Sequence, residues 1–253
     1  IEEEGQLVGF DVTVGGGFGM THGKPETYPR LADVIGFCRP EQVVEVAEKI
    51  VLVQRDHGDR SNRRHARLKY TIDDHGVDWF KGEVEKLLGW KLEAARDFTF
   101  QSMADPYGWV EGLDRLWYYT LFVEGGRVRD HDGRNLKTAL RQIAESHQGD
   151  FRLTANQNLV IGRASEEAKT KISQILSDHG VADAHEGSGL RLNSISCTAM
   201  PTCGLALAEA ERYLPDLVTA LEAVTEDCGL LADEIVIRMT GCPNGCGRPY
   251  LGE

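Results

Sequence analysis

Four cysteines near the end of the sequence have the type and spacing to hold a metal centre. Cys197 and Cys203 form a first clip with five residues between them, and Cys242 and Cys246 form a second clip with three. Four thiolates can bind either a tetrahedral zinc ion or a [4Fe-4S] cluster. Because zinc clips usually place about two to four residues between ligands, the wider first clip favours the larger cluster. Spacing alone leaves zinc open.

The residues around the clips favour an anionic group. Pro243 and Gly245 predict a tight turn that aims both thiols of the second clip to one side and exposes backbone N–H groups to sulfur. A long helical segment is predicted from Leu205 through Val224, interrupted by Pro215, so that it begins just after Cys203. The N-terminus of a helix carries partial positive charge, which stabilises a nearby anion.

A buried structural role is the alternative for any cysteine, since a free cysteine behaves as a small hydrophobe. We prefer this interpretation for the isolated Cys38 and Cys228, and metal ligation for the two clips, because thiol pairs shaped by proline and glycine seldom arise from packing alone. Six cysteines in 253 residues are too sparse for a disulfide scaffold. The clustered thiols therefore predict ligands in a reducing compartment, the cytoplasm.

The composition limits the class of protein. With 41% hydrophobic residues, the 253-residue chain can build one large domain or two modest ones. A formal net charge of -12 argues against nucleic acid or an anionic membrane as partner, because an acidic surface repels phosphates. No run approaches the roughly 18 apolar residues of a membrane span. Residues 1–4 lack the features of a signal peptide, and the abrupt beginning and end predict a fragment of a longer protein.

Hydrophobic periodicity predicts both helices and strands. The predicted strands cover residues 7–14, 117–123, 151–154, 159–161 and 234–239. The predicted helices run from about residue 40 to 57, and over residues 77–88, 136–147 and about 165–179. From residue 117 onward the order strand, helix, strand, strand, helix is typical of a split βαβ unit. The predicted fold class is therefore α+β, with mixed and antiparallel sheets flanked by helices.

Two further segments could bind an anion. A glycine-rich loop at residues 15–19 allows close approach of the backbone to a partner, although it is not a dinucleotide-binding fingerprint. A basic run stands out in the acidic chain, and its members are Arg60, Arg63, Arg64, Arg67 and Lys69. The alternative for the first three is a solvated helix face, since charge runs usually face water.

The sequence resembles the sirohaem-containing sulfite and nitrite reductases. Two segments carry this resemblance most strongly, Pro-Thr-Cys-Gly-Leu-Ala-Leu-Ala-Glu-Ala-Glu-Arg at residues 201–212 and Thr-Gly-Cys-Pro-Asn-Gly-Cys-Gly-Arg at residues 240–248. It extends over essentially the whole chain, including Thr-His-Gly-Lys at residues 21–24 and Thr-Ala-Asn-Gln-Asn at residues 154–158. The stretch Leu-Ala-Glu-Ala-Glu-Arg is similar within that family to the assimilatory sulfite reductase haemoproteins.

The resemblance implies two coupled cofactors. The cysteines that match the family's ligands to a [4Fe-4S] cluster are Cys197, Cys203, Cys242 and Cys246. In the family the last of these, Cys246, also provides the axial ligand of the sirohaem iron. The resemblance further implies that Arg67 and Lys69 lie at the sirohaem carboxylates, with Asn244 as another contact. His22 and His57 are not expected to be iron ligands, because the family's axial ligand is the thiolate.

The implied function is the six-electron reduction of sulfite to sulfide, in sulfate assimilation and cysteine biosynthesis. The electron donor is a flavoprotein subunit or a ferredoxin, and the sequence does not distinguish them. A sirohaem nitrite reductase and a non-enzymatic, zinc-stapled binding module are the alternatives. Pro-Thr-Cys-Gly-Leu at residues 201–205 favours sulfite over nitrite.

The resemblance also implies a domain organisation. Residues 1–100 are expected to be the latter part of a first sirohaem-binding half, residues 105–165 a ferredoxin-like half-domain, and residues 166–253 the beginning of a second sirohaem- and cluster-binding half. Family members are roughly twice as long, and further sulfite-binding basic residues lie upstream of the matched part. We therefore expect little sirohaem binding or sulfite turnover from these residues alone.

Overall fold

The computed structural model describes residues 1–21 and 23–252. His22 lies outside the described residues, so its expected role stays a prediction. The chain divides into two units, which are described separately. Unit 1 comprises residues 1–101 together with 243–245, and unit 2 comprises residues 102–242 together with the end of the chain from Cys246. Within the described residues, no helix combines the length and apolar character needed to cross a membrane.

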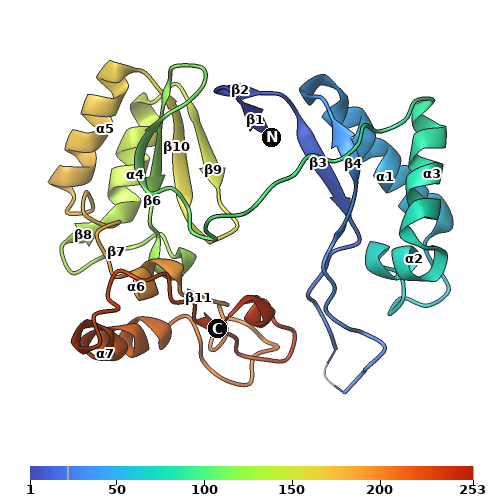
Figure 1. Ribbon diagram of the computed structural model, residues 1–253. Helices are drawn as coiled ribbons and strands as arrows, with labels where there is room; N and C mark the ends of the chain where they lie inside the picture. Colours follow the sequence, from blue (N-terminus) through green and yellow to red (C-terminus); the bar gives the residue numbers. More distant parts are fainter. Residues whose placement is uncertain (22, 253) are drawn as a thin grey trace. The chain divides into compact units, whose positions relative to one another are not determined.

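Unit 1 is a two-stranded sheet packed against three helices (Figure 1). A short hairpin of β1 (Glu2–Glu3) and β2 (Gln6–Leu7) precedes it. Strands β3 (Phe10–Val14) and β4 (Asp33–Cys38) pair antiparallel. A 3-10 turn (Pro40–Gln42) leads into the helices, which are α1 (Val43–His57), α2 (Leu68–His75) and α3 (Val77–Leu88). Their apolar faces and the strands enclose one core, which includes Val14, Ile35, Cys38, Val46, Val53, Ile72, Phe80 and Val84.

The helices of unit 1 follow local sequence signals. Pro40 begins the 3-10 turn before α1, where its missing N–H costs no hydrogen bond. Helix α1 ends at Gly58, whose N–H donates to the Gln54 carbonyl at 2.9 Å. Helix α3 has the predicted bounds and ends at Gly89, whose φ of 75° lies in the left-handed region. These two predictions are confirmed.

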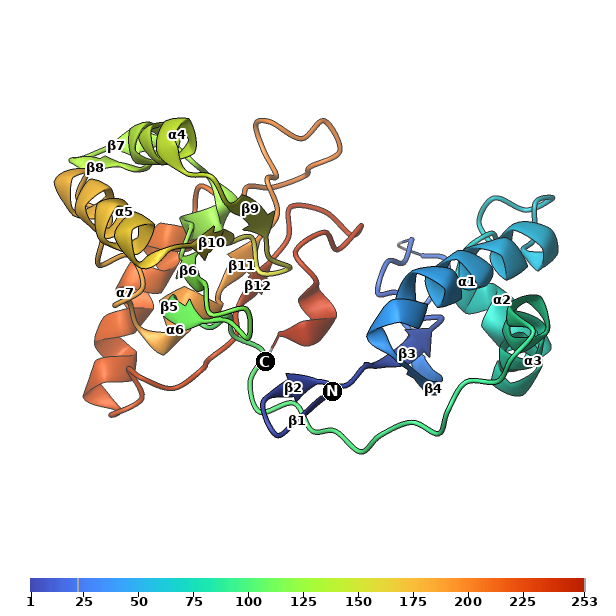
Figure 2. The same cartoon turned by 90° about the horizontal axis from the view of Figure 1, so that it is seen from above.

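Unit 2 begins with a four-stranded antiparallel sheet in the order β5-β6-β10-β9. Its strands are β5 (Gly108–Glu111), β6 (Trp117–Leu121), β9 (Asp150–Leu153) and β10 (Leu159–Ala164). Helices α4 (Leu136–Ser146) and α5 (Glu166–Asp178) cover one face of the sheet (Figures 1 and 2). A 3-10 turn (Glu124–Gly126) and a hairpin of β7 (Asp130–His131) and β8 (Arg134–Asn135) join β6 to α4.

The topology of this sheet confirms the predicted split βαβ unit. Strands β6 and β9 both pair antiparallel with β10, so they run parallel to each other with β10 between them. Helix α4 makes the crossover from β6 to β9. The α+β class is confirmed as well, since small, mainly antiparallel sheets are flanked by helices in both units.

The remainder of unit 2 is built from short elements. They are α6 (Gly189–Asn193), β11 (Ile195–Ser196), α7 (Leu214–Asp227), β12 (Arg238–Met239) and a final 3-10 turn (Pro249–Leu251). Leu190, Leu214 and Val218 form a small core, against which Ile235, Ile237 and Met239 pack. The predicted strand over residues 234–239 is therefore too long, because only its last two residues pair with β11.

The predicted helix directly after Cys203 is wrong. Helix α7 begins only at Leu214, with Pro215 in its first turn. Upstream of it, the amides of Leu207 and Ala208 both donate to the Gly241 carbonyl, at 2.8 and 3.1 Å. Because these amides bond to a distant segment, they cannot form intrahelical hydrogen bonds. Among the described residues, the predicted helix N-terminus next to Cys203 is therefore not formed.

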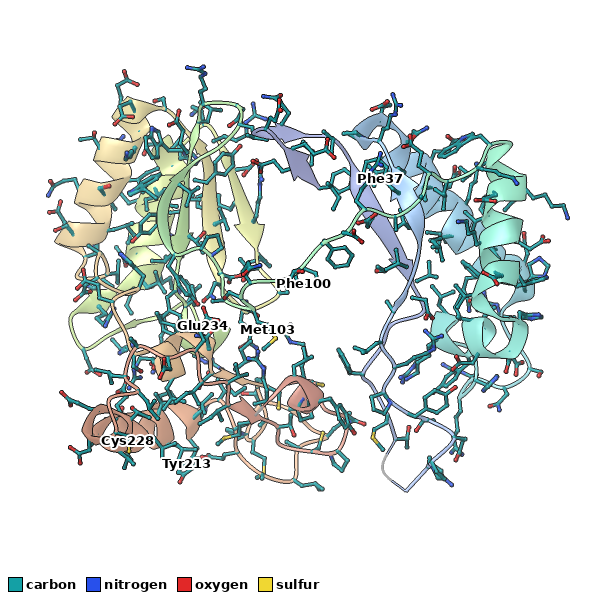
Figure 3. All side chains as sticks on the ribbon, in the orientation of Figure 1. Phe37, Phe100, Met103, Tyr213, Cys228 and Glu234 are labelled. Carbon is teal, nitrogen blue, oxygen red and sulfur yellow. The ribbon has the colours of Figure 1, made fainter. Side chains whose placement is uncertain are left out.

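Two smaller predictions also need correction. Cys38 is fully buried as expected, but Cys228 is exposed at the end of α7 (Figure 3). The buried residues of α7 lie in its first half, at Leu214 and Val218, so its last turn has no core to enter. Arg60, Arg63 and Arg64 are exposed as expected, yet they lie in the loop between α1 and α2 and not on a helix face.

Candidate metal centre

The two cysteine clips meet because the strands that precede them are paired in parallel. Ile195 pairs with Arg238 and Ser196 pairs with Met239, so both segments leave the pair in the same direction. Cys197 follows β11 directly, and Cys242 comes three residues after β12. The pairing continues past the strands, since the Cys197 amide donates to the Met239 carbonyl at 3.1 Å. Two segments that are about forty residues apart in sequence are thus held side by side.

Gly241 is the point of closest approach between the clips. Its amide donates to the Cys197 sulfur at 3.2 Å, and its carbonyl accepts from the loop that follows the first clip. A Cβ at this position would lie 2.6 Å from the Ala199 Cβ and 2.7 Å from the Ala208 carbonyl oxygen, so only glycine fits. An N–H donor to sulfur stabilises a thiolate, and metal binding requires thiolates.

The second clip forms the predicted tight turn. Residues 243–244 form a turn, and Gly245 has a φ of 68° in the left-handed region, where glycine carries no steric penalty. Cys246 is exposed, whereas Cys197, Cys203 and Cys242 are half-buried, and all four are free thiols. Over residues 1–21 and 23–252, no three His, Cys, Asp or Glu side chains already converge on a metal position. The backbone brings the clips together, but the thiols are not yet arranged as ligands.

Two arginines make the surroundings of the second clip cationic. Arg238 is part of β12, and Arg248 comes two residues after Cys246. Burial, and then repulsion from Arg248, lower the pKa of Arg238. The Arg238 Nε is buried without a hydrogen-bond partner in the described part of the chain, although one Nη donates to the Asn193 carbonyl at 3.0 Å. A half-buried cation of this kind is stabilised by a nearby anion, which fits the charge of a thiolate-bound cluster.

A buried carboxylate ties the segment after the first clip to the sheet. Glu211 is only 7% exposed and forms a bidentate ion pair with Arg127, which follows the 3-10 turn after β6. The hydrogen bonds from Arg127 to Glu211 raise the pKa of the arginine. The adjacent Ala210 is completely buried. This part of the Leu-Ala-Glu-Ala-Glu-Arg motif therefore has a structural role in positioning the loop that carries Cys203.

In unit 1, Arg67 and Lys69 hold the glycine loop (residues 15–19). Arg67 donates to the Gly19 carbonyl at 2.7 Å. Lys69 is 1% exposed, and its ammonium donates to the carbonyls of Gly17 at 3.2 Å, Gly19 at 3.0 Å and Tyr28. Burial, and then the charge of Arg67, lower the pKa of Lys69. Arg67 is exposed and keeps donors for another ligand, whereas the Lys69 donors are already bonded to carbonyls.

Asp73 organises the neighbouring charges of unit 1. It accepts hydrogen bonds from the Tyr28 hydroxyl at 2.5 Å and from the Arg30 Nε at 2.8 Å. Burial raises the pKa of Asp73, but these two hydrogen bonds and the charges of Arg30 and Lys69 together outweigh it, so the net pKa is lowered. The same contact with Asp73 raises the pKa of Tyr28 to about 12.

The structure brings together some of the predicted site residues and leaves others apart. All four clip cysteines belong to unit 2, and Arg67 and Lys69 meet at the glycine loop of unit 1. Asn244 is exposed in the turn of the second clip, within residues 243–245 that are grouped with unit 1.

Sequence reasoning missed four residues around the clips. Arg238 and Arg248 supply positive charge, and Asn156 and Gln157 bond to the two clip segments. The available signal was the run of small and polar residues at 154–158 between two strands, a composition typical of side chains that bond to backbone.

Two descriptions of one enzyme family match parts of the chain. The nitrite and sulphite reductase 4Fe-4S domain matches residues 1–92, and the nitrite/sulfite reductase ferredoxin-like half domain matches residues 111–185. The first match contains one cysteine, Cys38, and both matches end before the cysteine clips.

Curated relatives match the whole chain, clips included. The sulfite reductase [NADPH] hemoprotein beta-components of Anoxybacillus flavithermus, Geobacillus kaustophilus and Bacillus subtilis are 57%, 56% and 55% identical to it. Each alignment covers 100% of this chain and 44% of the relative, so the chain spans less than half the length of these proteins. Among solved structures, the NirA protein of Mycobacterium tuberculosis matches with a TM-score of 0.76 and 28% identity, over 95% of this chain and 42% of NirA.

Proposed function

From the premise that this chain belongs to the nitrite and sulfite reductase family, we propose that it is part of a sulfite reductase haemoprotein. The whole protein reduces sulfite to sulfide with six electrons. The four clip cysteines would hold a [4Fe-4S] cluster, and the Cys246 thiolate would also hold the sirohaem. When bound, the two coupled groups supply electrons to the sulfur of sulfite, a task that amino-acid side chains cannot perform.

The observation that carries this proposal is the parallel pairing of β11 with β12. It directs the two clips to the same side, with the Gly241 amide already hydrogen-bonded to the Cys197 sulfur. The five residues between Cys197 and Cys203 exceed the spacing of about two to four that zinc clips usually have. The chain supplies the four soft donors and the N–H···S contact that an iron–sulfur cluster requires.

The charges of the chain support binding of an anionic cluster. Arg238 and Arg248 stand next to the second clip, and the pKa of Arg238 is already lowered by burial and by its neighbour. An anion at the clips relieves this repulsion. We therefore propose that the two arginines favour the more reduced, more negative state of the cluster.

On the sirohaem side, we propose roles for Arg67, Lys69 and Asn244. Arg67 has free donors for a carboxylate. Lys69 is bonded to three backbone carbonyls, so we propose that it stabilises the conformation of the glycine loop and that its charge acts on the sirohaem through this loop. Asn244 is exposed within the second clip and can donate an amide hydrogen bond.

The proposed domain organisation keeps the boundaries expected from the resemblance. Residues 1–100 belong to one sirohaem-binding half, residues 105–165 to a ferredoxin-like half-domain, and residues 166–253 to the cluster-binding half. The four-stranded sheet and α4 lie within residues 105–165 and support a half-domain there. The match of a ferredoxin-like half domain covers residues 111–185 and so extends past this boundary to include α5.

Sulfite is preferred to nitrite as the substrate, because the three curated relatives described above are all sulfite reductases by name. Those names also specify NADPH, so we propose a flavoprotein partner as electron donor in preference to ferredoxin. The proposed location is the cytoplasm, where free thiols stay reduced.

The test is a comparison of substrates with the whole protein, purified without oxygen and supplied with a chemical electron donor. Sulfide formation from sulfite is expected at a higher kcat/KM than ammonia formation from nitrite. The Cys246→Ser variant should lose the sirohaem absorption band, while Cys228→Ser, at the exposed end of α7, should keep it. Faster turnover of nitrite would identify a nitrite reductase, and colourless protein with bound zinc would refute both enzymes.

A further inference from the structure

We propose that Asn156 and Gln157 are positioning residues that hold the two cysteine clips in place for the cluster. They lie in the polar turn, residues 154–158, between β9 and β10. The identity of the cluster rests on the proposed function, but the hydrogen bonds to the clip segments do not. Through this turn, the ferredoxin-like sheet has a direct role in positioning the metal ligands.

The polar turn is a rigid base. The Thr154 amide donates to the Asn158 carbonyl at 3.0 Å and closes the turn. Asp105 then gathers three of its side chains, accepting from the Thr154 hydroxyl at 2.5 Å, the Asn156 amide at 3.2 Å and the Asn158 amide at 2.8 Å. Asn158 is 1% exposed and also accepts from the Val123 amide at 2.9 Å. Because these inward contacts fix the turn, the remaining polar atoms of Asn156 and Gln157 can hold other segments in place. We call these two side chains the strut residues.

One strut reaches the first clip. The Gln157 side-chain amide donates to the Ser196 carbonyl at 2.8 Å, and Ser196 directly precedes Cys197. That carbonyl belongs to the peptide bond that leads into the first ligand. The hydrogen bond therefore fixes the plane from which Cys197 projects.

A second strut reaches the end of the second clip. Arg248, two residues after Cys246, donates through Nη2 to the Asn156 Oδ1 at 2.9 Å. Asn156 is oriented for this contact because its Nδ2 donates to the Met103 carbonyl at 2.9 Å as well as to Asp105. The bond is charge-assisted, which makes it stronger than a bond between neutral groups.

Backbone conformation points to the same region. Three non-glycine residues near the clips have positive φ, namely Gln157 at 68°, Ala199 at 50° and Arg248 at 57°. Such conformations persist only where the surroundings hold them, and they concentrate at functional sites. Two of the three take part in the contacts described above, since Gln157 bonds to the segment before Cys197 and Arg248 bonds to Asn156.

The test compares Gln157→Ala and Asn156→Ala with matched controls. Gln174→Ala removes an exposed glutamine that donates to Asp178 at 2.7 Å on α5, and Asn135→Ala removes an exposed asparagine whose side chain makes no cap to α4. The full chain is loaded with iron and sulfide without oxygen and then challenged with a chelator. Each strut variant is expected to lose iron about fivefold faster than its control, the equivalent of one hydrogen bond. The EPR g values of the reduced cluster should also shift, which a loss of global stability would not produce.

A measurement on the apoprotein separates this inference from the proposed function. Alkylation of Cys197, followed by mass spectrometry, should be faster in Gln157→Ala than in Gln174→Ala, by more than any difference between their unfolding midpoints explains. If the wild-type chain binds zinc instead of iron, the proposed function fails and the alkylation rates still decide the positioning role. Equal rates of Cys197 alkylation and equal metal loss in variant and control would overturn it. If Gln157→Ala does not fold, Gln157→Glu serves, since it keeps the size and replaces the donor with an acceptor.

Discussion

The clearest prediction on stability concerns Asn158, the buried centre of the polar turn. Its side chain accepts from the Val123 amide at 2.9 Å and donates to Asp105 at 2.8 Å and to the Tyr107 hydroxyl at 3.0 Å. In Asn158→Ala the Val123 amide, on a residue that is 3% exposed, loses its acceptor and gains no water. One orphaned buried N–H costs about 1–3 kcal/mol and each of the two lost donor bonds about 1 kcal/mol, so unit 2 should lose about 3–5 kcal/mol. For a domain of this size that is a fall in Tm of roughly 6–20 °C.

Thermal unfolding and hydrogen exchange check this prediction together. Asn135→Ala is the control, because Asn135 is exposed and its side chain makes no cap to α4. The control should melt close to wild type, and Asn158→Ala should also lose protection at the Val123 amide. If Asn158→Ala melts within about one degree of the control and Val123 stays protected, the assignment of the turn as a rigid base is wrong.

Three further predictions concern the charges and thiols. Lys69→Met should lower the free energy of unfolding of unit 1 by about 2 kcal/mol and speed hydrogen exchange in the glycine loop, since three carbonyls lose their donor. The exposed Lys86→Met is the control and should have neither effect. Equal hydrogen exchange in the two variants would contradict this prediction. Because the pKa of Asp73 is lowered in the folded state, the stability that its carboxylate contributes is complete above the unfolded pKa of about 4 and is lost as the pH falls through the folded pKa. Asp73→Asn should therefore be less stable than wild type at neutral pH and approach wild type in acid, as measured by unfolding monitored by circular dichroism. A difference in stability between variant and wild type that stays constant with pH would refute this. Cys203→Ser should bind little iron after anaerobic loading, while Cys228→Ser should bind the wild-type amount. Iron analysis of both variants checks this, and equal iron contents would contradict it.

The elements that sequence predicted well are those specified by neighbouring residues. Helix α3 has an apolar period and a terminal glycine, and both its ends were correct. The segment after Cys203 has similar helical composition but is not helical, because its amides bond to Gly241, more than thirty residues away. Contacts of that kind leave no periodic signal in the local sequence.

The candidate site likewise combines features that neighbouring residues specify with features that depend on distant contacts. The four cysteines and the turn of the second clip were predicted from residue types and spacing, whereas their convergence depends on β11 and β12, which are each two residues long. Strands this short cannot be recognised by alternation. Lys69 was predicted as a contact to carboxylates, yet its surroundings are three carbonyls brought in by the glycine loop and by Tyr28. The roles of Asn156 and Gln157 likewise depend on distant partners.

The most direct test of the four-cysteine cluster is iron and acid-labile sulfide analysis of the protein isolated without oxygen, combined with its absorption spectrum. We expect about four iron atoms and about four sulfides per chain at the clips, with one more iron and a long-wavelength chlorin band in the whole protein that carries sirohaem. A colourless protein with one tightly bound zinc ion per chain, and no acid-labile sulfide, would contradict it.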